Sequence, residues 1–375
     1  MGKITKAVLL GMLVAAAVPP VVYWGRDEAY AASKDAALRN TAEMTARLAG
    51  AMTNRREGVS FAYAGSTSRL KAAIKTSIEQ AMASDPYLYY IVDSYAYSYQ
   101  GGSKSAQVSV KLKYRESLQE TAYVDARVKA VLQKIVHPGM NPHEKVKAIH
   151  DWVVLNLRYD LSYTRYTAYE ALHDGSAVCQ GYSLLTYKLL KAAGIPVRIA
   201  EGTARQNGRS QSHAWNLVQL EGKWYHLDTT WDDPLPDRSG EASTNYYLLS
   251  DAQMRQDHSW TRDYPAAGTV YAGTLEKLAA AGGSEAAVYR ALEKDLGYDI
   301  LNEEQAVGSA AELSILALQK KAEGGTSVQF RYRGGESSLK SDLQQLYKLG
   351  FESLSYSAER LAGTNDLKVE VNWKS

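Results

Sequence analysis

The chain has 375 residues, and its 43 lysines and arginines nearly balance 41 aspartates and glutamates, leaving a formal net charge of +2. This balance gives no support for a nucleic-acid-binding function. Because Cys179 is the only cysteine, an intramolecular disulfide is excluded. Stability must therefore come from packed cores, and the chain is long enough for roughly two or three of them.

Residues 1–31 are predicted to be a secretion signal. Lys3 and Lys6 precede the apolar run "AVLLGMLVAAAVPPVVYW", and Ala29-Tyr30-Ala31 supplies a small-x-small cleavage pattern. The alternative is an uncleaved membrane anchor, although the Pro19-Pro20 pair interrupts a straight spanning helix. We therefore expect the protein to lie outside the cytoplasmic membrane, secreted or held at the cell wall.

Residues 32–117 are predicted to form a helix followed by a small β-α-β-β domain. The strand pattern "GVSFAYAGS" is followed by "TSRLKAAIKTSIEQAMAS", whose apolar residues recur with helical spacing. Two further alternating stretches, "YIVDSYAYSYQ" and "AQVSVKLKYR", flank a turn at Gly101-Gly102.

Residues 267–375 are predicted to repeat that order after a helical linker. The stretch from residue 327 to 374 again reads strand, helix, strand, strand, and its first part aligns with the N-terminal domain without gaps. The matched pairs are Val59 with Val328, Phe61 with Phe330, Tyr63 with Tyr332, Gly65 with Gly334 and Leu70 with Leu339. We therefore expect the same topology in both copies, with ordinary cores and no chemistry of their own.

The middle of the chain, residues 118–266, has a different pattern. Two helices are predicted, and the second opens with Asn141 as cap, Pro142 in the first turn and Glu144 in a capping-box position. A polar, aromatic loop, "LRYDLSYTRYT", leads to another helix that ends at Gly194. Three strands follow: "IPVRIAEGTA", "SHAWNLVQL" and "KWYHLDTTW".

Cys179 is predicted to lie in the first turn of a helix, just after the turn at Asp174-Gly175-Ser176. Free backbone N–H groups and the helix dipole stabilise a thiolate there, and the same groups can hold an oxyanion. Gly181 is expected to leave space beside the sulfur. The alternative is a small buried hydrophobic residue, the usual environment of a free cysteine. The candidate partners of Cys179, which are His213 and Asp228, favour a nucleophile over a buried hydrophobic residue.

The segment "SHAWNLVQLEGKWYHLDTTW" is predicted to be a hairpin that turns at Glu221-Gly222. A two- or four-residue loop pairs Leu220 with Lys223 and puts His213 and Asp228 on the same face as diagonal neighbours. A three-residue loop would put them on opposite faces. With the first register, Asp228 orients His213, which takes the proton of the Cys179 thiol.

Other interpretations of these segments remain open. A zinc site is one, although no short Cys-x-x-Cys or His-x-x-x-His pair supports it. Its ligands would be Cys179, His213, His226 and Asp228. Sugar stacking on tryptophans is another, with packing beneath the sheet as its equal: the residues are Trp215, Trp224 and Trp231.

The middle segment resembles the core of the transglutaminase-like superfamily. Three motifs occur in the family's order: Cys179-Gln180-Gly181, His213-Ala214-Trp215 and Leu227-Asp228-Thr229-Thr230-Trp231. The stretches "EKVKAIHDWVVLNLRYD" and "NYYLLSDAQMRQDHSW" resemble segments that precede and close the domain. The resemblance implies an α+β fold with a papain-like core, here flanked by two small β-α-β-β domains. It also implies thiol chemistry at a carboxamide, with Cys179, His213 and Asp228 as catalytic residues.

The resemblance also suggests Tyr159, in "LRYD", as the side chain that assists the oxyanion. No calcium-loop pattern is present, and we expect neither a cofactor nor a metal. The expected function is a secreted thiol enzyme that acts on protein or cell-wall peptide amides through a thioester. Hydrolysis is favoured because the bordering segments "LRYDLSYTRYT" and "TARQNGRSQS" are polar. The alternatives are a protein cross-linking transglutaminase and a catalytically silent module that binds peptide or glycan.

Overall fold

The computed structural model describes residues 21–22, 36–206, 208–233, 242–298, 306–361 and 365–374. It divides into two compact units, Met1–Gly268 and Thr269–Ser375. The predicted secretion signal lies outside the described residues except for β1 (Val21–Val22). Within those ranges, no helix combines the length and the apolar character needed to cross a bilayer.

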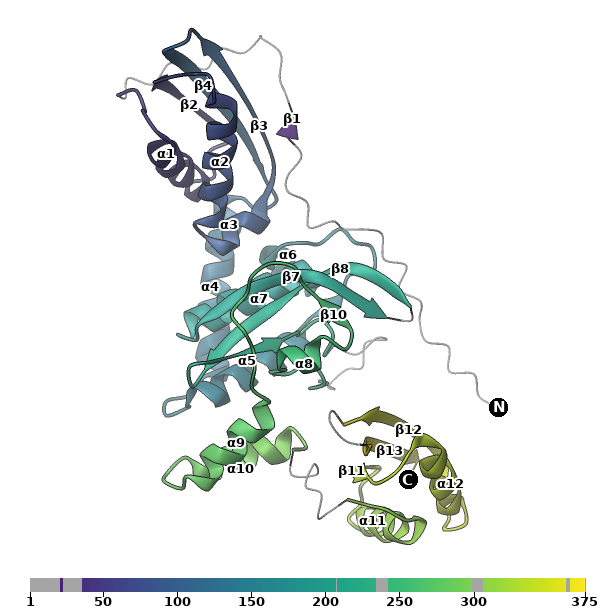
Figure 1. The fold of residues 1–375 in the computed structure, drawn as a ribbon. Helices are drawn as coiled ribbons and strands as arrows, with labels where there is room; N and C mark the ends of the chain where they lie inside the picture. The colour runs from purple at the N-terminus through teal and green to yellow at the C-terminus, as the bar shows by residue number, and fades with distance from the viewer. Residues whose placement is uncertain are drawn as a thin grey trace. The chain divides into compact units, whose positions relative to one another are not determined.

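The N-terminal part of the first unit pairs two helices with a four-stranded sheet (Figure 1). The strand order is β1-β3-β4-β2. Its remaining elements are α1 (Thr41–Thr53), β2 (Gly58–Ala64), α2 (Leu70–Ala83), α3 (Pro86–Ile91), β3 (Val92–Gly101) and β4 (Ser105–Tyr114). Burial alternates along β4, which is typical of a sheet with one covered face.

The short helix α3 corrects the predicted start of the second strand. The alternating stretch was expected to begin at Tyr90, but β3 begins at Val92. Asp85 caps α3 by accepting a hydrogen bond from the backbone N–H of Tyr87, and Pro86 occupies the first helical position. This local capping overrides the aromatic strand pattern.

In the described part of the second unit, three helices precede the sheet. The elements are α9 (Tyr271–Ala280), α10 (Ala286–Asp295), α11 (Ala310–Ala322), β11 (Ser327–Tyr332), α12 (Glu336–Tyr347), β12 (Glu352–Arg360) and β13 (Leu367–Lys374). The strand order β11-β13-β12 places the third strand between the first and the second. The strands β2, β3 and β4 have the same arrangement, also with antiparallel pairs.

The middle of the first unit packs helices against an antiparallel sheet of order β10-β7-β8-β9. Its elements are α4 (Leu118–Ile135), α5 (Pro142–Asn156), β5 (Arg158–Tyr159), α6 (Ala168–Asp174), β6 (Ser176–Ala177), α7 (Cys179–Ala192), β7 (Val197–Gln206), β8 (Arg209–Leu220), β9 (Lys223–Leu227), α8 (Asp251–Met254) and β10 (His258–Ser259). The helix α7 lies against one face, where Asn216 Nδ2 donates to the Ser183 carbonyl at 3.1 Å. The opposite face carries a core that includes Trp215, Leu217 and Met254.

The hairpin of β8 and β9 has the predicted register. Leu220 pairs with Lys223, and Asn216 pairs with Leu227. Glu221 and Gly222 form the two-residue turn with φ of 50° and 73°, as a type I′ turn requires. Because β9 ends at Leu227, Asp228 leaves the sheet directly after a strand whose facing is fixed by this turn.

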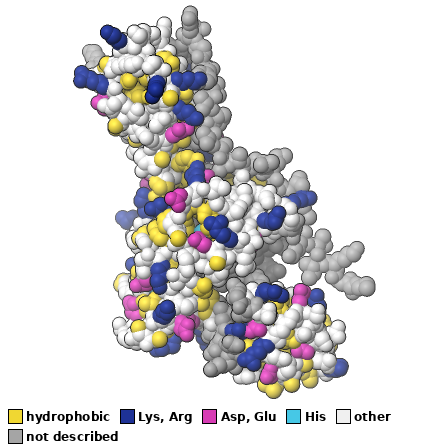
Figure 2. All heavy atoms as spheres, viewed as in Figure 1, with side chains coloured by type: hydrophobic (Ala, Val, Ile, Leu, Met, Phe, Trp, Pro, Cys, Tyr) yellow, Lys and Arg dark blue, Asp and Glu magenta, His cyan; other side chains and the backbone are white. Residues whose placement is uncertain are grey.

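Charged side chains do not gather in one patch on the face drawn in Figure 2. Basic and acidic groups are interspersed there, in keeping with the small net charge.

Candidate active site

Cys179 is the first residue of α7 and is partly exposed. Val178 is the N-cap residue, and its side chain makes no capping hydrogen bond. In the first turn, the backbone N–H of Gly181 donates to the Val178 carbonyl at 2.9 Å. The role expected for Gly181 is corrected here. A Cβ at this residue would come within 2.5 Å of Ala177 Cβ and 3.0 Å of the Thr167 carbonyl oxygen. Glycine therefore lets the preceding segment pack on the helix.

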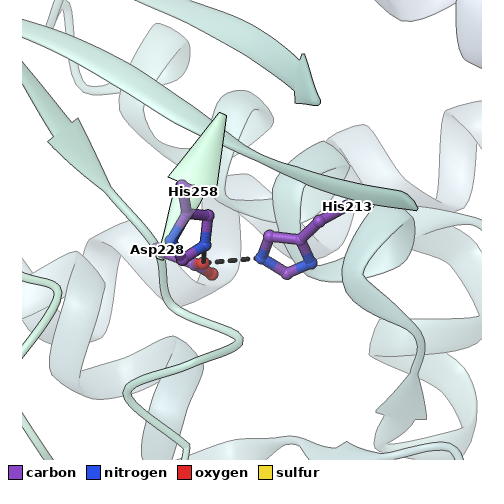
Figure 3. A group of neighbouring side chains, drawn as sticks. All are labelled: His213, Asp228 and His258. Carbon is purple, nitrogen blue, oxygen red and sulfur yellow. Dashed lines mark hydrogen bonds and ion pairs between the residues drawn. The ribbon is translucent and has the colours of Figure 1, made fainter. Parts of the chain in front are cut away.

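His213 is buried on β8, near enough to Cys179 for the thiol to contribute to the shift of its pKa. Its Nε2 donates to Asp228 Oδ2 at 2.6 Å, and its other ring nitrogen points away from Asp228 (Figure 3). Burial by itself would lower the pKa of His213. The charge and hydrogen bond of Asp228, with the contact to Cys179, instead raise that pKa to about 10.

Asp228 is fully buried, and both of its oxygens accept hydrogen bonds. Oδ1 accepts from the backbone N–H groups of Thr230 at 3.0 Å and Trp231 at 3.2 Å. Oδ2 accepts from His213 and, at 3.2 Å, from His258 Nε2 (Figure 3). Burial would raise the pKa of this carboxyl, but the two imidazoles hold it well below its usual range.

The turn that carries Asp228 is tied to α5 through a second buried pair. Asp232 Oδ1 accepts from the backbone N–H of Tyr246 at 2.8 Å, and Asp232 Oδ2 accepts from His150 Nε2 at 3.0 Å. The other ring nitrogen of His150 donates to Asp151 at 2.8 Å. These contacts fix where the backbone goes after Asp228.

His258, on β10, was not predicted as a site residue, although it lies in the segment "QDHSW" that resembles the end of the domain. It reaches Asp228 because β10 pairs with β7, which places His258 opposite Ala204. A two-residue strand has no periodic pattern, so the only sequence signal for this placement was the motif itself.

Tyr159 lies close to Cys179. It pairs with Ala177, two residues before the cysteine, in the small sheet of β5 and β6. Burial raises its pKa, and the charge of Cys179 raises it further. Tyr163 is in a similar position, because burial and then the Cys179 charge raise its pKa as well. Both tyrosines, in the segment that follows α5, therefore lie near enough to Cys179 for its charge to affect them.

The loop itself is shaped by Asp160. Its carboxylate accepts from the backbone N–H groups of Ser162 at 3.0 Å, Thr164 at 2.8 Å and Arg165 at 2.9 Å. Burial opposes ionisation of Asp160, but these hydrogen bonds and that of the Ser162 hydroxyl lower its pKa to about 2. The Tyr-Asp pair thus places Tyr159 at the site and uses Asp160 to hold the loop.

A short helix from the N-terminal part also lies beside Cys179. Gln180 Nε2 donates to the backbone carbonyl of Tyr90 on α3 at 3.1 Å. The Tyr90 hydroxyl donates to Glu201 Oε1 at 2.6 Å, and Glu201 forms an ion pair with Arg262 at 2.9 Å. The first turn of α7 is therefore in contact with α3.

The zinc interpretation that included His226 is wrong in its ligand set. His226 Nδ1 accepts from Trp215 Nε1 at 2.8 Å, and its Nε2 donates to Asp251 at 2.8 Å. Ligand-type atoms of His213, Asp228 and His258 do lie within 4.8 Å of one another. The two hydrogen bonds to Asp228 account for that spacing, so we interpret the group as a hydrogen-bonded relay.

The three tryptophans considered for sugar stacking pack against neighbouring side chains of the protein. Trp215 is 1% exposed and stacks on His213, with ring centroids 5.9 Å apart, so it has no face for a sugar. Trp231 meets the His258 ring edge-on at 4.5 Å. Trp224 lies under the Arg198 guanidinium at 5.4 Å.

Comparisons with known proteins agree with this site. The sequence model of the Transglutaminase-like superfamily matches residues 129–229, which include Cys179, His213 and Asp228. The kyphoscoliosis peptidase of Mus musculus is 26% identical over 188 residues, which cover 44% of this chain and 28% of that protein. The Homo sapiens peptidase is 29% identical over 192 residues, with the same coverage of 44% and 28%.

This chain therefore spans less than a third of the length of those two relatives. Among solved structures, that of a TGase matches with a TM-score of 0.30 and 13% identity, covering 50% of this chain and 58% of that one. The matched family, with the order and the placement of the three motifs, identifies the middle of the molecule. Residues 129–229 of this chain match the Transglutaminase-like superfamily.

Proposed function

We propose that this protein is a thiol enzyme that acts on carboxamides of protein or peptide substrates. Cys179 would be the nucleophile, His213 the general base and acid, and Asp228 the group that orients His213. One observation carries the proposal. Cys179 begins α7 near His213, whose Nε2 lies 2.6 Å from the buried Asp228 carboxylate.

The reaction follows from these contacts. His213 takes the thiol proton, and the Cys179 sulfur bonds to the carbonyl carbon. The N–H groups at the start of α7 and the hydroxyl of Tyr159 donate to the oxyanion. His213 returns the proton to the leaving nitrogen as the C–N bond breaks, which leaves a thioester. Water then attacks the thioester, His213 takes a proton from it, and the acid leaves as the thiol re-forms.

Hydrolysis is favoured over transfer to an amine. The end of β7 and the start of β8, the strand that carries His213, are polar and exposed at Arg205, Gln206, Arg209 and Ser210. Such a border gives water access to a thioester. The two curated relatives also carry the name peptidase. Cross-linking by an amine substrate uses the same three residues and is the second candidate, followed by a silent binding module.

The test begins with the reactivity of the thiol. Because Cys179 is the only cysteine, iodoacetamide labelling of the protein reports on this residue alone. We expect rapid labelling at neutral pH and a large loss of rate in His213→Ala. A glutamine-containing peptide is then offered with and without excess primary amine, and products are identified by mass, with Cys179→Ser as the blank.

The products separate the candidates. Free acid or cleaved peptide that persists under saturating amine supports hydrolysis. Amine incorporation as the main product supports the cross-linking enzyme. An unreactive Cys179 with no product of either kind supports the binding module and contradicts the proposal.

We also place the protein outside the cytoplasmic membrane, on the basis of the charged and apolar pattern in residues 1–31. Substrates would then be extracellular or cell-wall peptides. Fractionation of cells that express the full chain, with N-terminal sequencing of the product, checks this placement. Recovery of the intact chain in the cytoplasm would contradict it.

A further inference from the structure

The carboxylate of Asp228 accepts hydrogen bonds from two imidazoles, those of His213 and His258. His213 is the one that lies near the Cys179 thiol. We propose that His258 is a positioning residue of this site. It is an imidazolium that is held by Asp257 and donates a hydrogen bond to Asp228, so that the Asp228 carboxylate interacts with both His258 and His213. This inference rests on the proposed function, because a role for His258 requires that Cys179 and His213 do chemistry.

The hydrogen bonds of His258 determine its charge. Its Nε2 lies 3.2 Å from Asp228 Oδ2, and its Nδ1 lies 2.5 Å from Asp257 Oδ1. A carboxylate oxygen only accepts, so each ring nitrogen must carry a proton. His258 is 2% exposed, and a buried cation is stable only when it is paired, as it is here on both sides.

His258 is held in place from several directions. Tyr246 donates its hydroxyl to the other oxygen of Asp257 at 2.5 Å. The rings of Trp231 and Trp215 lie 4.5 and 5.3 Å from the His258 ring. At Gly202 of β7, a Cβ would come within 2.0 Å of the Ser259 carbonyl oxygen, so only glycine lets β10 approach this closely.

The charge on His258 has a consequence for the thiol. Two carboxylates face His258, those of Asp228 and Asp257. The His213 and Tyr246 rings lie 5.2 and 5.5 Å from the His258 ring, measured between centroids. The remaining titratable neighbour is His226, whose pKa is lowered first by burial and in part by the His258 charge. A cation here adds positive potential at the Cys179–His213 pair. It therefore favours the Cys179 thiolate, and its removal should move thiolate formation to higher pH.

His226 supplies a matched control. It is also a buried imidazole, it lies on β9 of the same sheet, and its loss removes two hydrogen bonds. Its Nδ1 accepts from Trp215, so the ring carries one proton and no charge, and it does not contact Asp228. A purely structural effect of losing an imidazole would appear equally in both variants.

The experiment measures thiolate formation at Cys179 between pH 4 and 8, by the iodoacetamide rate and by thiolate absorbance. His258→Gln keeps a neutral donor at the Nε2 position. We expect its midpoint to rise by roughly one pH unit, the scale of one unit charge across a protein interior. His258→Asn also loses the donor to Asp228, so its maximal rate should fall about tenfold as well. His226→Gln should keep the wild-type midpoint.

Asp257→Asn changes a partly exposed residue, so it tests the same contact without altering the buried core. It should raise the midpoint of Cys179 thiolate formation by a smaller amount than His258→Gln. A wild-type midpoint typical of an ordinary thiol would overturn the proposed function and this inference together. A shifted wild-type midpoint that His258→Gln leaves unchanged would overturn the role of His258 alone. Equal shifts in His258→Gln and His226→Gln would also overturn it.

Discussion

The hydroxyl of Tyr90 on α3 donates to the carboxylate of Glu201 on β7 at 2.6 Å. The two residues are separated by 111 positions, and Glu201 is 8% exposed. Since the backbone carbonyl of Tyr90 also accepts from Gln180, a single residue joins α3 to both the sheet and the first turn of α7. The N-terminal part is thus hydrogen-bonded to residues beside the candidate nucleophile, Cys179.

Tyr90→Phe should therefore weaken the attachment of α3. The substitution keeps the ring and leaves the buried Glu201 with one partner fewer, so we expect the free energy of unfolding to fall by about 1–2 kcal/mol. Urea unfolding measures this loss. Tyr89→Phe is the control, because the Tyr89 hydroxyl accepts only an exposed hydrogen bond from Arg262. Equal losses in the two variants would contradict the importance of the Tyr90 contact.

Tyr159→Phe tests the oxyanion assignment. If the Tyr159 hydroxyl donates only in the transition state, its removal should lower kcat by about 10²-fold and leave KM unchanged. The rate of Cys179 alkylation should not change, since no oxyanion forms in that reaction. Tyr163→Phe, at the neighbouring tyrosine, is the comparison, and an equal loss of kcat in that variant would contradict the assignment of the oxyanion to Tyr159. A loss confined to KM would mean that Tyr159 binds substrate and does not stabilise the oxyanion.

The pH dependence of stability follows from the shifted groups. Folding raises the pKa of His213 from 6.5 to about 10, so its contribution is fully present below about pH 6.5 and is lost as pH rises toward 10. Asp228 behaves in the opposite way. Its pKa is depressed below 3.8, so its contribution is present above that value and is lost as pH falls through the folded pKa.

We therefore expect wild-type stability to fall more steeply than that of His213→Ala between pH 7 and 10. Urea midpoints measured across that range give the comparison. His226→Ala is the control, because folding lowers the pKa of His226, first through burial. Parallel curves for wild type and His213→Ala would show that His213 takes up no proton on folding.

Gly181→Ala should disrupt the start of α7. The added Cβ would meet Ala177 Cβ at 2.5 Å and the Thr167 backbone at 3.0 Å, so the segment before Cys179 must move. We expect lower stability and a slower alkylation of Cys179. Gly50→Ala is the matched control inside α1, where a Cβ meets nothing within 4 Å and helix propensity should add up to ~1 kcal/mol of stability. A stable and fully reactive Gly181→Ala would contradict the packing argument.

The relation of His213 to Asp228 could be predicted because it depends on local rules. The dipeptide Glu221-Gly222 specifies a two-residue turn, and the alternation of the strands then fixes which side chains share a face. The cap at Asn141 was predictable for the same reason, since its partner Glu144 is three residues away.

The contacts that could not be predicted join distant segments. His150 and Asp232 are 82 positions apart, and His258 reaches Asp228 only after β10 has paired with β7. No spacing in the sequence encodes either approach. The helix α3 is a different case, because Asp85-Pro86 is a local signal that the aromatic alternation of the following residues obscured.

Because β8 and β9 are joined by the turn at Glu221-Gly222, the chemistry depends on whether the number of residues in this turn is odd or even. His213 and Asp228 are 15 positions apart, and one inserted residue in the turn would flip β9 so that Asp228 faced away from the imidazole. Two inserted residues would restore the facing. Length variation that preserves the site at this hairpin should therefore occur in steps of two, whereas exposed loops elsewhere can change by any number.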